Sequence, residues 1–155
     1  LYLLLMAGGV TLAGYLVADT ILSHLAQGVL LMWLSILILL GVSLLGGTLL
    51  STLANGVMVF GLFGIAFIGG WIEQFGAFLN SQAAVNVGIV TSLLLPSEAM
   101  WRRAAFDMQS PLVAAMGVSP FASQSAPSPV MVGYALLYLF VMLGLAMRRF
   151  GRRDL

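Results

Sequence analysis

Residues 28–46 read GVLLMWLSILILLGVSLLG, and this stretch contains no charged side chain. A helix that crosses a membrane needs about 20 consecutive apolar residues, so the stretch is long enough to cross by itself. The rest of the chain is similar: 61% of its 155 residues are hydrophobic and only 7% are charged. Soluble domains carry about 25% charged residues. The sequence therefore predicts an all-α, polytopic membrane helix bundle.

Three further stretches are apolar and long enough to be spans. They cover about 1–18, 50–72 and 130–147, which with 28–46 makes four spans in a single transmembrane domain, 1–155. The first stretch starts inside an apolar run, without an initiator Met or a positively charged leader. We therefore expect further sequence to precede it.

The segment 73–129 breaks this pattern and is predicted to be an external segment. Residues 83–95 are apolar but end at Pro96, and runs of about 10–14 residues are typical of re-entrant or interfacial segments. If 83–95 crossed as a fifth span instead, the orientation of everything upstream would reverse. Ahead of it, residues at helical spacing predict a helix in the membrane interface, namely Phe75, Phe78 and Leu79.

A short helix is predicted directly after Pro96, with Ser97 as its N-cap and Glu98 in its first turn. Its apolar face comprises Trp101, Ala104, Ala105 and Met108. The opposite face carries two charge pairs at four-residue spacing, Glu98–Arg102 and Arg103–Asp107. Four of the five prolines lie in 109–129, which indicates a loop.

The positive charge of the chain is concentrated in its tail, 148–155. Lysine is absent, and four of the six arginines are Arg148, Arg149, Arg152 and Arg153. Positively charged residues next to a span stay in the cytoplasm, so we expect a cytoplasmic C-terminus, an external 73–129 and a cytoplasmic turn at 46–48. A tail of eight residues behind a span contacts the lipid surface, so no nucleic acid is expected as a partner.

Small residues at four-residue spacing let membrane helices approach closely. The first span contains two such pairs, Gly9–Ala13 and Gly14–Ala18. The third span contains Ala66–Gly70, together with Gly56, Gly61, Gly64 and Gly69. We expect these positions to lie at helix contacts.

The chain lacks the residues of the common catalytic and metal sites. Without lysine a P-loop is impossible, so any ATP used must bind another polypeptide. Cysteine is absent, His24 is the only histidine, and neither H-E-x-x-H nor G-x-S-x-G occurs. Met100, Met108 and Met116 could suit Cu(I), but methionine also fills packing gaps. We expect no catalytic residue, no metal ligand and no cofactor.

Polar residues inside membrane spans are expensive and often functional. The candidates are Asn55, early in the third span, and Glu73 with Gln74 at its far end. Each has a simpler alternative: Asn55 could hydrogen-bond a neighbouring helix, and Glu73 could end the span at the interface beside Trp71. Both interpretations stay open at this point.

Three motifs in this order resemble one family. They are Ser51-Thr52-Leu53-Ala54-Asn55-Gly56 at the start of a span, Leu94-Leu95-Pro96-Ser97-Glu98 followed by Trp101-Arg102, and the ending Arg149-Phe150-Gly151-Arg152-Arg153-Asp154-Leu155. The chain resembles the C-terminal part of a permease subunit of type-two ATP-binding-cassette (ABC) exporters, which are multi-pass membrane proteins of bacteria and archaea.

The resemblance implies the last four of six spans, with a re-entrant external segment before the last. It also implies a bacterial or archaeal cell membrane, a second permease copy, and a separate ATPase subunit that drives substrate export. The family-motif positions would be Asn55, Pro96, Glu98 and Arg102. With the polar candidates Glu73 and Gln74 they make up the possible transport or gating positions. The family's cytoplasmic coupling helix is not in this sequence.

Two other functions are compatible with the sequence. The chain could be a membrane scaffold or assembly subunit for maturation of a copper metalloenzyme. It could also be an ion-coupled secondary transporter, against which the scarcity of charges inside the spans argues.

Overall fold

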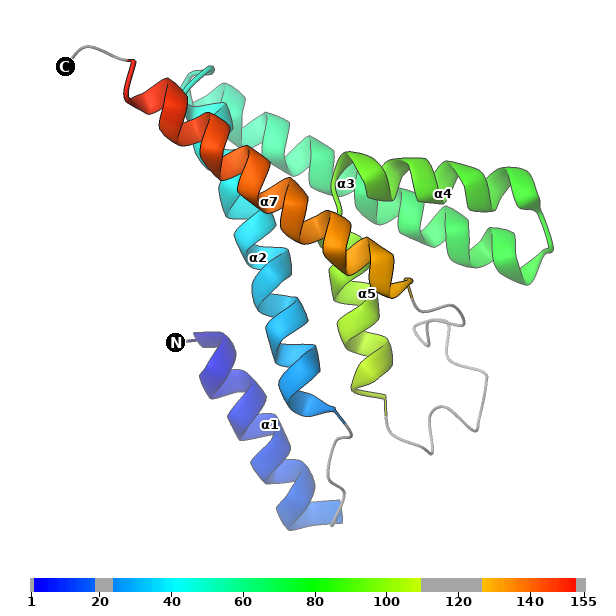
Figure 1. Cartoon of the computed structure of the whole chain (residues 1–155). Helices are drawn as coiled ribbons and strands as arrows, with labels where there is room; N and C mark the ends of the chain where they lie inside the picture. The colour runs from blue at the N-terminus through cyan, green and yellow to red at the C-terminus, as the bar shows by residue number, and fades with distance from the viewer. Residues whose placement is uncertain (1, 19–23, 110–126, 153–155) are drawn as a thin grey trace.

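The computed structural model describes residues 2–18, 24–109 and 127–152, and the elements within these ranges are all α-helices. The all-α prediction is confirmed. In chain order the helices are α1 (Tyr2–Ala18), α2 (Leu25–Gly47), α3 (Thr52–Phe78), α4 (Gln82–Leu94), α5 (Ser97–Asp107) and α7 (Pro129–Phe150), arranged as Figure 1 shows.

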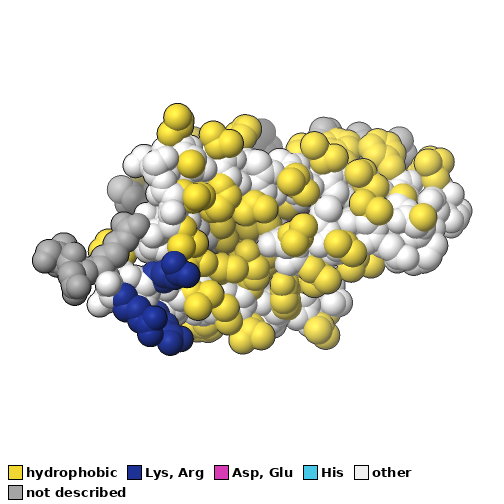
Figure 2. Space-filling view, turned by 90° about the horizontal axis from the view of Figure 1, so that it is seen from above, with side chains coloured by type: hydrophobic (Ala, Val, Ile, Leu, Met, Phe, Trp, Pro, Cys, Tyr) yellow, Lys and Arg dark blue, Asp and Glu magenta, His cyan; other side chains and the backbone are white. Residues whose placement is uncertain are grey.

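Three of the helices, α2, α3 and α7, are long and apolar enough to cross a membrane. Large apolar side chains cover their outer faces; Leu53 and Phe60 of α3, for example, are 82% and 80% exposed. Figure 2 shows one face of the molecule largely covered by hydrophobic side chains, with arginines at one end. Such a surface is unfavourable in water and suits lipid, so the chain is a multi-pass membrane protein.

The first predicted span corresponds to α1, which differs from the other three. It has 17 residues and is therefore about 26 Å long, somewhat shorter than the hydrocarbon core of about 30 Å. Among the described helices it contacts only α2, and Gly9 and Ala13 are exposed. Of the two small-residue pairs predicted there, Gly9–Ala13 is not at a helix contact within the described part of the chain.

The third predicted span, 50–72, is extended in the structure by about two turns. Helix α3 starts at Thr52 and continues to Phe78. Ser51 is its N-cap, and the Ser51 hydroxyl accepts a hydrogen bond from the Ala54 amide at 3.5 Å. The prediction of a separate interfacial helix from Phe75 onward is therefore wrong. The polar residue that was expected to end the span, Glu73, has a charged partner (described below), so the helix continues past it.

A tight turn then reverses the chain. Asn80 has a positive φ of 54°, and the Ser81 amide donates to the Gly76 carbonyl at 2.8 Å. This is the left-handed helix termination in which the chain folds back over the last carbonyls. It sends α4 back antiparallel along α3.

The contact between α3 and α4 consists of small residues. A Cβ added at Gly76 would lie 2.6 Å from Ala84 Cβ, and one at Gly88 would lie 2.8 Å from the backbone oxygen of Gly69. Gly69 itself faces Thr91. The predicted packing role is confirmed for Gly69, and Ala66 and Gly70 are also buried. It is wrong for the other three glycines, which have open space around them: Gly56, Gly61 and Gly64.

Helices α4 and α5 meet at Leu95 and Pro96 with a bend of 109°. Proline lacks an amide hydrogen and disfavours a helical residue before it, so the helix ends there. Two tyrosines of α7 bond the last carbonyls of α4: Tyr134 Oη donates to the Leu93 oxygen at 2.7 Å and Tyr138 Oη to the Leu94 oxygen at 3.1 Å.

The helix pair enters the bundle and returns to the same side. Helix α4 starts beside the end of α3, and the bend reaches the middle of α2, where Ser35 Oγ donates to the Ser97 carbonyl at 2.9 Å. Helix α5 then returns to the start of α2, where Met108 packs on Gly28. Because α2 and α3 are consecutive spans, the start of α2 and the end of α3 lie on one side. Residues 83–95 thus lie in a bent helix pair whose two ends return to the same side, which is the geometry of a re-entrant segment.

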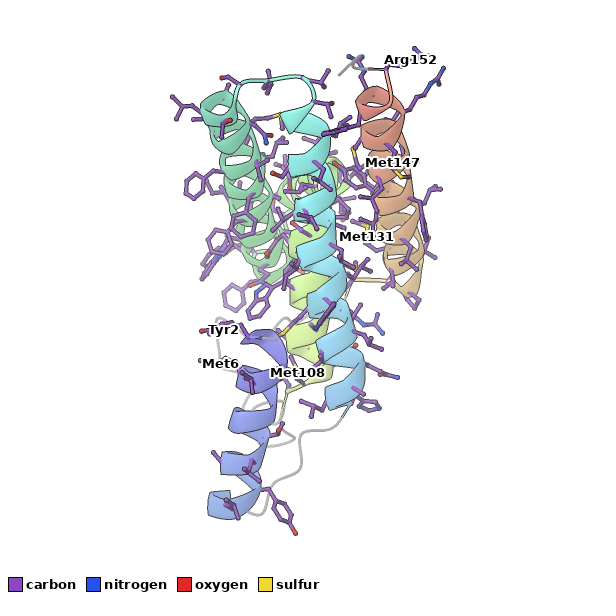
Figure 3. All side chains as sticks on the ribbon, turned by 90° about the vertical axis from the view of Figure 1, so that its left-hand side faces the viewer. Tyr2, Met6, Met108, Met131, Met147 and Arg152 are labelled. Carbon is purple, nitrogen blue, oxygen red and sulfur yellow. The ribbon has the colours of Figure 1, made fainter. Side chains whose placement is uncertain are left out.

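The apolar core lies where α2, α5 and α7 meet. Leu34, Ile38 and Val42 repeat every four residues along α2 and pack against residues of the other elements, namely Leu95, Ala99, Met100, Ala135 and Leu139. Helix α7 ends beside the α2–α3 turn, where Arg152 lies at the same end as that turn in Figure 3. The end of α7 and the α2–α3 turn therefore share one side of the bundle, opposite to the entry of the re-entrant segment.

Candidate functional site: a buried ion cluster

Four polar side chains from three helices meet inside the protein. Glu73 comes from α3, Ser92 from α4, and Glu98 and Arg102 from successive turns of α5. We call these four residues the Arg102 cluster. Glu98, Arg102 and Ser92 are each only 4% exposed. The cluster is therefore enclosed by the re-entrant segment and the third span.

Arg102 is the centre of the cluster. Its Nη2 donates to Glu73 Oε2 at 2.9 Å and to Ser92 Oγ at 3.2 Å. Its Nε lies 3.7 Å from Glu98 Oε1, which is too long for a hydrogen bond. Arg102 and Glu73 thus form a charge-assisted pair, whereas Glu98 is held by charge alone.

Two glycines of the adjoining helices make room for the cluster. A Cβ at Gly70 of α3 would lie 2.9 Å from Glu98 Oε1, so this carboxyl group rests against the α3 backbone. A Cβ at Gly88 of α4 would collide with the Cβ of Glu73. Larger residues at either position would push the carboxyl groups away from Arg102.

Several polar atoms of the site have no hydrogen-bond partner among the described residues. They are Nε and Nη1 of Arg102 and Oγ of Ser97. Buried polar groups are normally paired with protein or ordered water. Of these, Arg102 Nε lies 3.7 Å from Glu98 Oε1, so the guanidinium keeps unused hydrogen-bonding capacity inside the site.

The structure brings together three of the residues that the sequence singled out: Glu73, Glu98 and Arg102. Pro96 is fully buried at the bend, where it positions α5 rather than contacting the ions. Gln74 is only partly buried, and no hydrogen bond joins it to the cluster in the described part of the chain. Glu73 therefore does more than end the span at an interface.

The Glu98–Arg102 pair was predicted correctly, but its surroundings were not. The sequence pattern placed this pair opposite the apolar face of α5, yet both side chains are buried while Trp101 is 49% exposed. Ser97 is the first helical residue, and the N-cap is Pro96, so the predicted capping role of Ser97 is wrong. In lipid an apolar side chain can face outward at no cost, and the charged face turns inward.

The second pair, Arg103–Asp107, is also present, with Nε and Oδ2 3.2 Å apart. Arg103 Nη1 additionally donates to the Pro127 carbonyl at 2.6 Å. This contact ties the end of the 109–129 segment to α5 just before α7 starts. Residues 110–126, where most of the predicted loop falls, lie outside the described residues.

Asn55 occupies a different site at the other end of α3. Its Nδ2 donates to the Ser43 carbonyl at 2.9 Å, and its amide group lies directly against Gly46. Asn55 thus bonds the neighbouring helix, as one of the two interpretations anticipated, and holds α3 close to α2 at their turn.

The remaining predictions concern the methionines, metal binding and the arginines of the tail. Met100 is buried in the core and Met108 packs on Gly28; Met116 lies outside the described residues. Figure 3 shows Met108, Met131 and Met147 at different levels of the molecule. Within the described ranges no three His, Cys, Asp or Glu side chains could hold a metal ion. Arg148 and Arg149 end α7, Arg152 follows it, and Arg153 falls in the part not described.

Sequence reasoning missed Ser92 and Gly88, and for Gly70 it predicted helix packing but not the contact with Glu98. Ser92 is an ordinary serine in an apolar helix, and its role depends on Arg102, ten residues later on another helix. Gly88 interrupts 83–95 at the position that meets Glu73, so a glycine inside a short apolar helix was the available signal.

The chain matches no protein-family model, and no similar protein was found among curated proteins or solved structures. The family resemblance described above therefore stays a prediction.

Proposed function

We propose that the chain is the membrane-spanning permease subunit of an ABC transporter. The observation that carries the proposal is the re-entrant pair α4–α5, which brings the buried Arg102 cluster into the bundle just before the last span. This is the layout that the sequence resemblance implies. The arginine-rich end of α7 on the opposite side supports the same arrangement.

In this proposal the chain itself does no covalent chemistry. A separate ATPase subunit binds and hydrolyses ATP, and two permease bundles rock against each other to change access to the substrate path. The stiff α3–α4 hairpin, with its small-residue contact, is suited to move as one rigid body. We propose a bacterial or archaeal cell membrane as the location, a cytoplasmic C-terminus, and export as the direction.

Co-purification and a transport assay test the proposal. Tagged full-length protein is expected to co-purify with a P-loop ATPase, and vanadate is expected to stop substrate release from proteoliposomes that contain both. The matched control carries a substitution of the P-loop lysine in the ATPase, which should also stop transport while leaving the complex intact. Absence of any ATPase in the purified complex, with transport unaffected by vanadate, would refute it.

Orientation is tested separately. A cysteine introduced at Gly151 is expected to react with a membrane-impermeant thiol reagent only after the cells are opened. A cysteine at Asn80, in the exposed turn between α3 and α4, is the matched control and should react in intact cells. The opposite pattern would place the tail outside.

A further inference from the structure

The charges of the Arg102 cluster do not balance. Two carboxyl groups, Glu73 and Glu98, share one guanidinium group. With both carboxyl groups ionised the cluster carries one net negative charge inside the protein. A net charge in such surroundings is strongly unfavourable, and a buried group commonly neutralises instead.

The two carboxyl groups are not equivalent. Glu73 accepts a hydrogen bond from Arg102 at 2.9 Å, and its side chain is 16% exposed. Glu98 accepts no hydrogen bond from Arg102 at 3.7 Å, and its side chain is 5% exposed. Glu98 is therefore the carboxyl group with the weaker partner and the drier surroundings, and it gains most from binding a proton.

Few other charged or titratable groups lie near Glu98. Helices α2 and α4 contain no acidic or basic residue. On α7 the nearest titratable groups are Tyr134 and Tyr138, whose hydroxyls already donate to backbone carbonyls. On α5 itself, Arg103 is paired with Asp107. Arg102 and Glu73 thus set the charge that Glu98 experiences.

The Arg102 guanidinium compensates the charge of Glu98 incompletely. Its Nε and Nη1 are buried and have no acceptor in the described chain, and Nε lies 3.7 Å from Glu98 Oε1. The ionised form of Glu98 therefore lacks a hydrogen bond from the guanidinium that would stabilise it.

We propose that Glu98 is a proton-binding site and that its protonation holds the re-entrant segment against α3. With the proton bound, the Arg102 cluster is neutral and the carboxyl group packs on Gly70. When the proton leaves, the net negative charge favours movement of the Glu98 carboxylate away from Gly70, while Arg102 keeps its hydrogen bond to Glu73. The inference does not depend on the proposed function, since it requires neither ATP nor an ATPase subunit.

Infrared difference spectroscopy of the purified full-length protein, without any ATPase, tests this directly. A shift from about pH 5 to about pH 8 is expected to remove a C=O stretching band of a protonated carboxyl group. Glu98→Gln is expected to lose this band. The matched control, Asp107→Asn, makes the same change on the same helix outside the cluster and should keep it.

A second variant and a second measurement guard against misfolding of Glu98→Gln. Glu73→Gln leaves one carboxylate for one guanidinium, so the band is expected to disappear from this pH range because Glu98 then stays ionised. Thermal unfolding of the native protein should be shifted to lower temperature at about pH 8 relative to about pH 5. A native protein without any such band, or a band that persists in Glu98→Gln, overturns the proposal.

Discussion

Both polar anchors of α3 face the inside of the bundle, but they work differently. Asn55 and Glu73 are 18 positions apart (73 − 55), which is five helical turns, so both lie on the same face of the helix. Asn55 is neutral and finds its partner on α2, across a short turn. Glu73 is charged, and its partner Arg102 comes from α5, 29 residues later.

The difference shows that the energetic cost of burying a polar side chain in this protein determines how many helices must surround it. A neutral amide at membrane depth needs no counter-charge, and the hairpin supplies a local acceptor for its N–H, the Ser43 carbonyl. A buried carboxylate needs a counter-charge, and the chain provides it only by folding a helix pair back into the bundle. The Asn55 site thus holds two helices together, whereas the Arg102 cluster requires three helices to be in place simultaneously.

Removal of Arg102 should have the largest effect. Arg102→Met leaves Glu73 and Glu98 without a counter-charge, and loss of one partner of a buried pair costs about 3–5 kcal/mol. Unfolding by SDS in mixed micelles would measure the change in the free energy of unfolding. The matched control is Arg103→Met, since Arg103 is 25% exposed, pairs with Asp107 and bonds the Pro127 carbonyl; it should cost less, about 1–2 kcal/mol.

The same experiment can separate loss of the ion pair from loss of packing. Arg102→Met combined with Glu73→Gln and Glu98→Gln removes the charges together, and replacing a whole buried ion network is often nearly neutral. We expect the triple variant to recover most of the lost stability. If Arg102→Met and Arg103→Met lower the free energy of unfolding by the same amount, the buried Arg102 cluster does not stabilise the fold more than the local Arg103–Asp107 pair does.

The substitution Gly88→Ala should have the second-largest effect on the free energy of unfolding. Gly88→Ala forces a methyl group against the Gly69 carbonyl and the Glu73 backbone, and overpacking of this kind costs about 1–3 kcal/mol. Gly64→Ala on α3 is the matched control because nothing lies within 4 Å of its added Cβ. It should be neutral or stabilise the helix by up to about 1 kcal/mol. Equal effects in the same SDS titration would mean that α3 and α4 are not in close contact.

How much of the fold and of the candidate site could be predicted from the sequence depends on how far apart along the chain the interacting residues lie. The spans at 28–46 and 130–147 follow from apolar runs alone, and the Glu98–Arg102 and Arg103–Asp107 pairs follow from helical spacing. The Arg102–Glu73 pair does not, because nothing local shows that α5 folds back beside α3. The end of α3 was misplaced for the same reason: an unpaired Glu73 would end a span, but a paired one does not.

The exposed side of α5 was misjudged for a different reason. In water Trp101 would be buried and Glu98 would face solvent, and the pattern was interpreted in that sense. In a membrane the outside is apolar, so the buried face of a re-entrant helix can include paired charges, as Glu98 and Arg102 do here beside Ala99, Met100 and Ala104. A buried face can therefore be assigned from sequence only when the surrounding solvent is known.

Asn55 should matter less than the ion cluster. Asn55→Ala removes the hydrogen bond to the Ser43 carbonyl, and such bonds in membrane proteins average about 0.6 kcal/mol. Gly46→Ala alone should be more harmful, since its methyl group meets the Asn55 amide. A double-mutant cycle in the SDS titration checks the contact: Gly46→Ala should cost less in the Asn55→Ala background. Additive effects would contradict it.

The smallest effect is expected at the bend, from Tyr134→Phe. The change deletes one hydroxyl that bonds the Leu93 carbonyl at 2.7 Å, and a net loss of about 0.5 kcal/mol is reasonable for one hydrogen bond. The Tyr138 hydroxyl still bonds the next carbonyl, so the helix end keeps one of its two partners. Hydrogen exchange should therefore become faster at the Leu95 amide and its neighbours, while the α2–α3 turn is unchanged. Tyr15→Phe on the peripheral α1 is the control. Faster exchange at both ends of α3 in Tyr134→Phe would show that the Asn55 site and the Arg102 cluster open together, and not as two separate anchors.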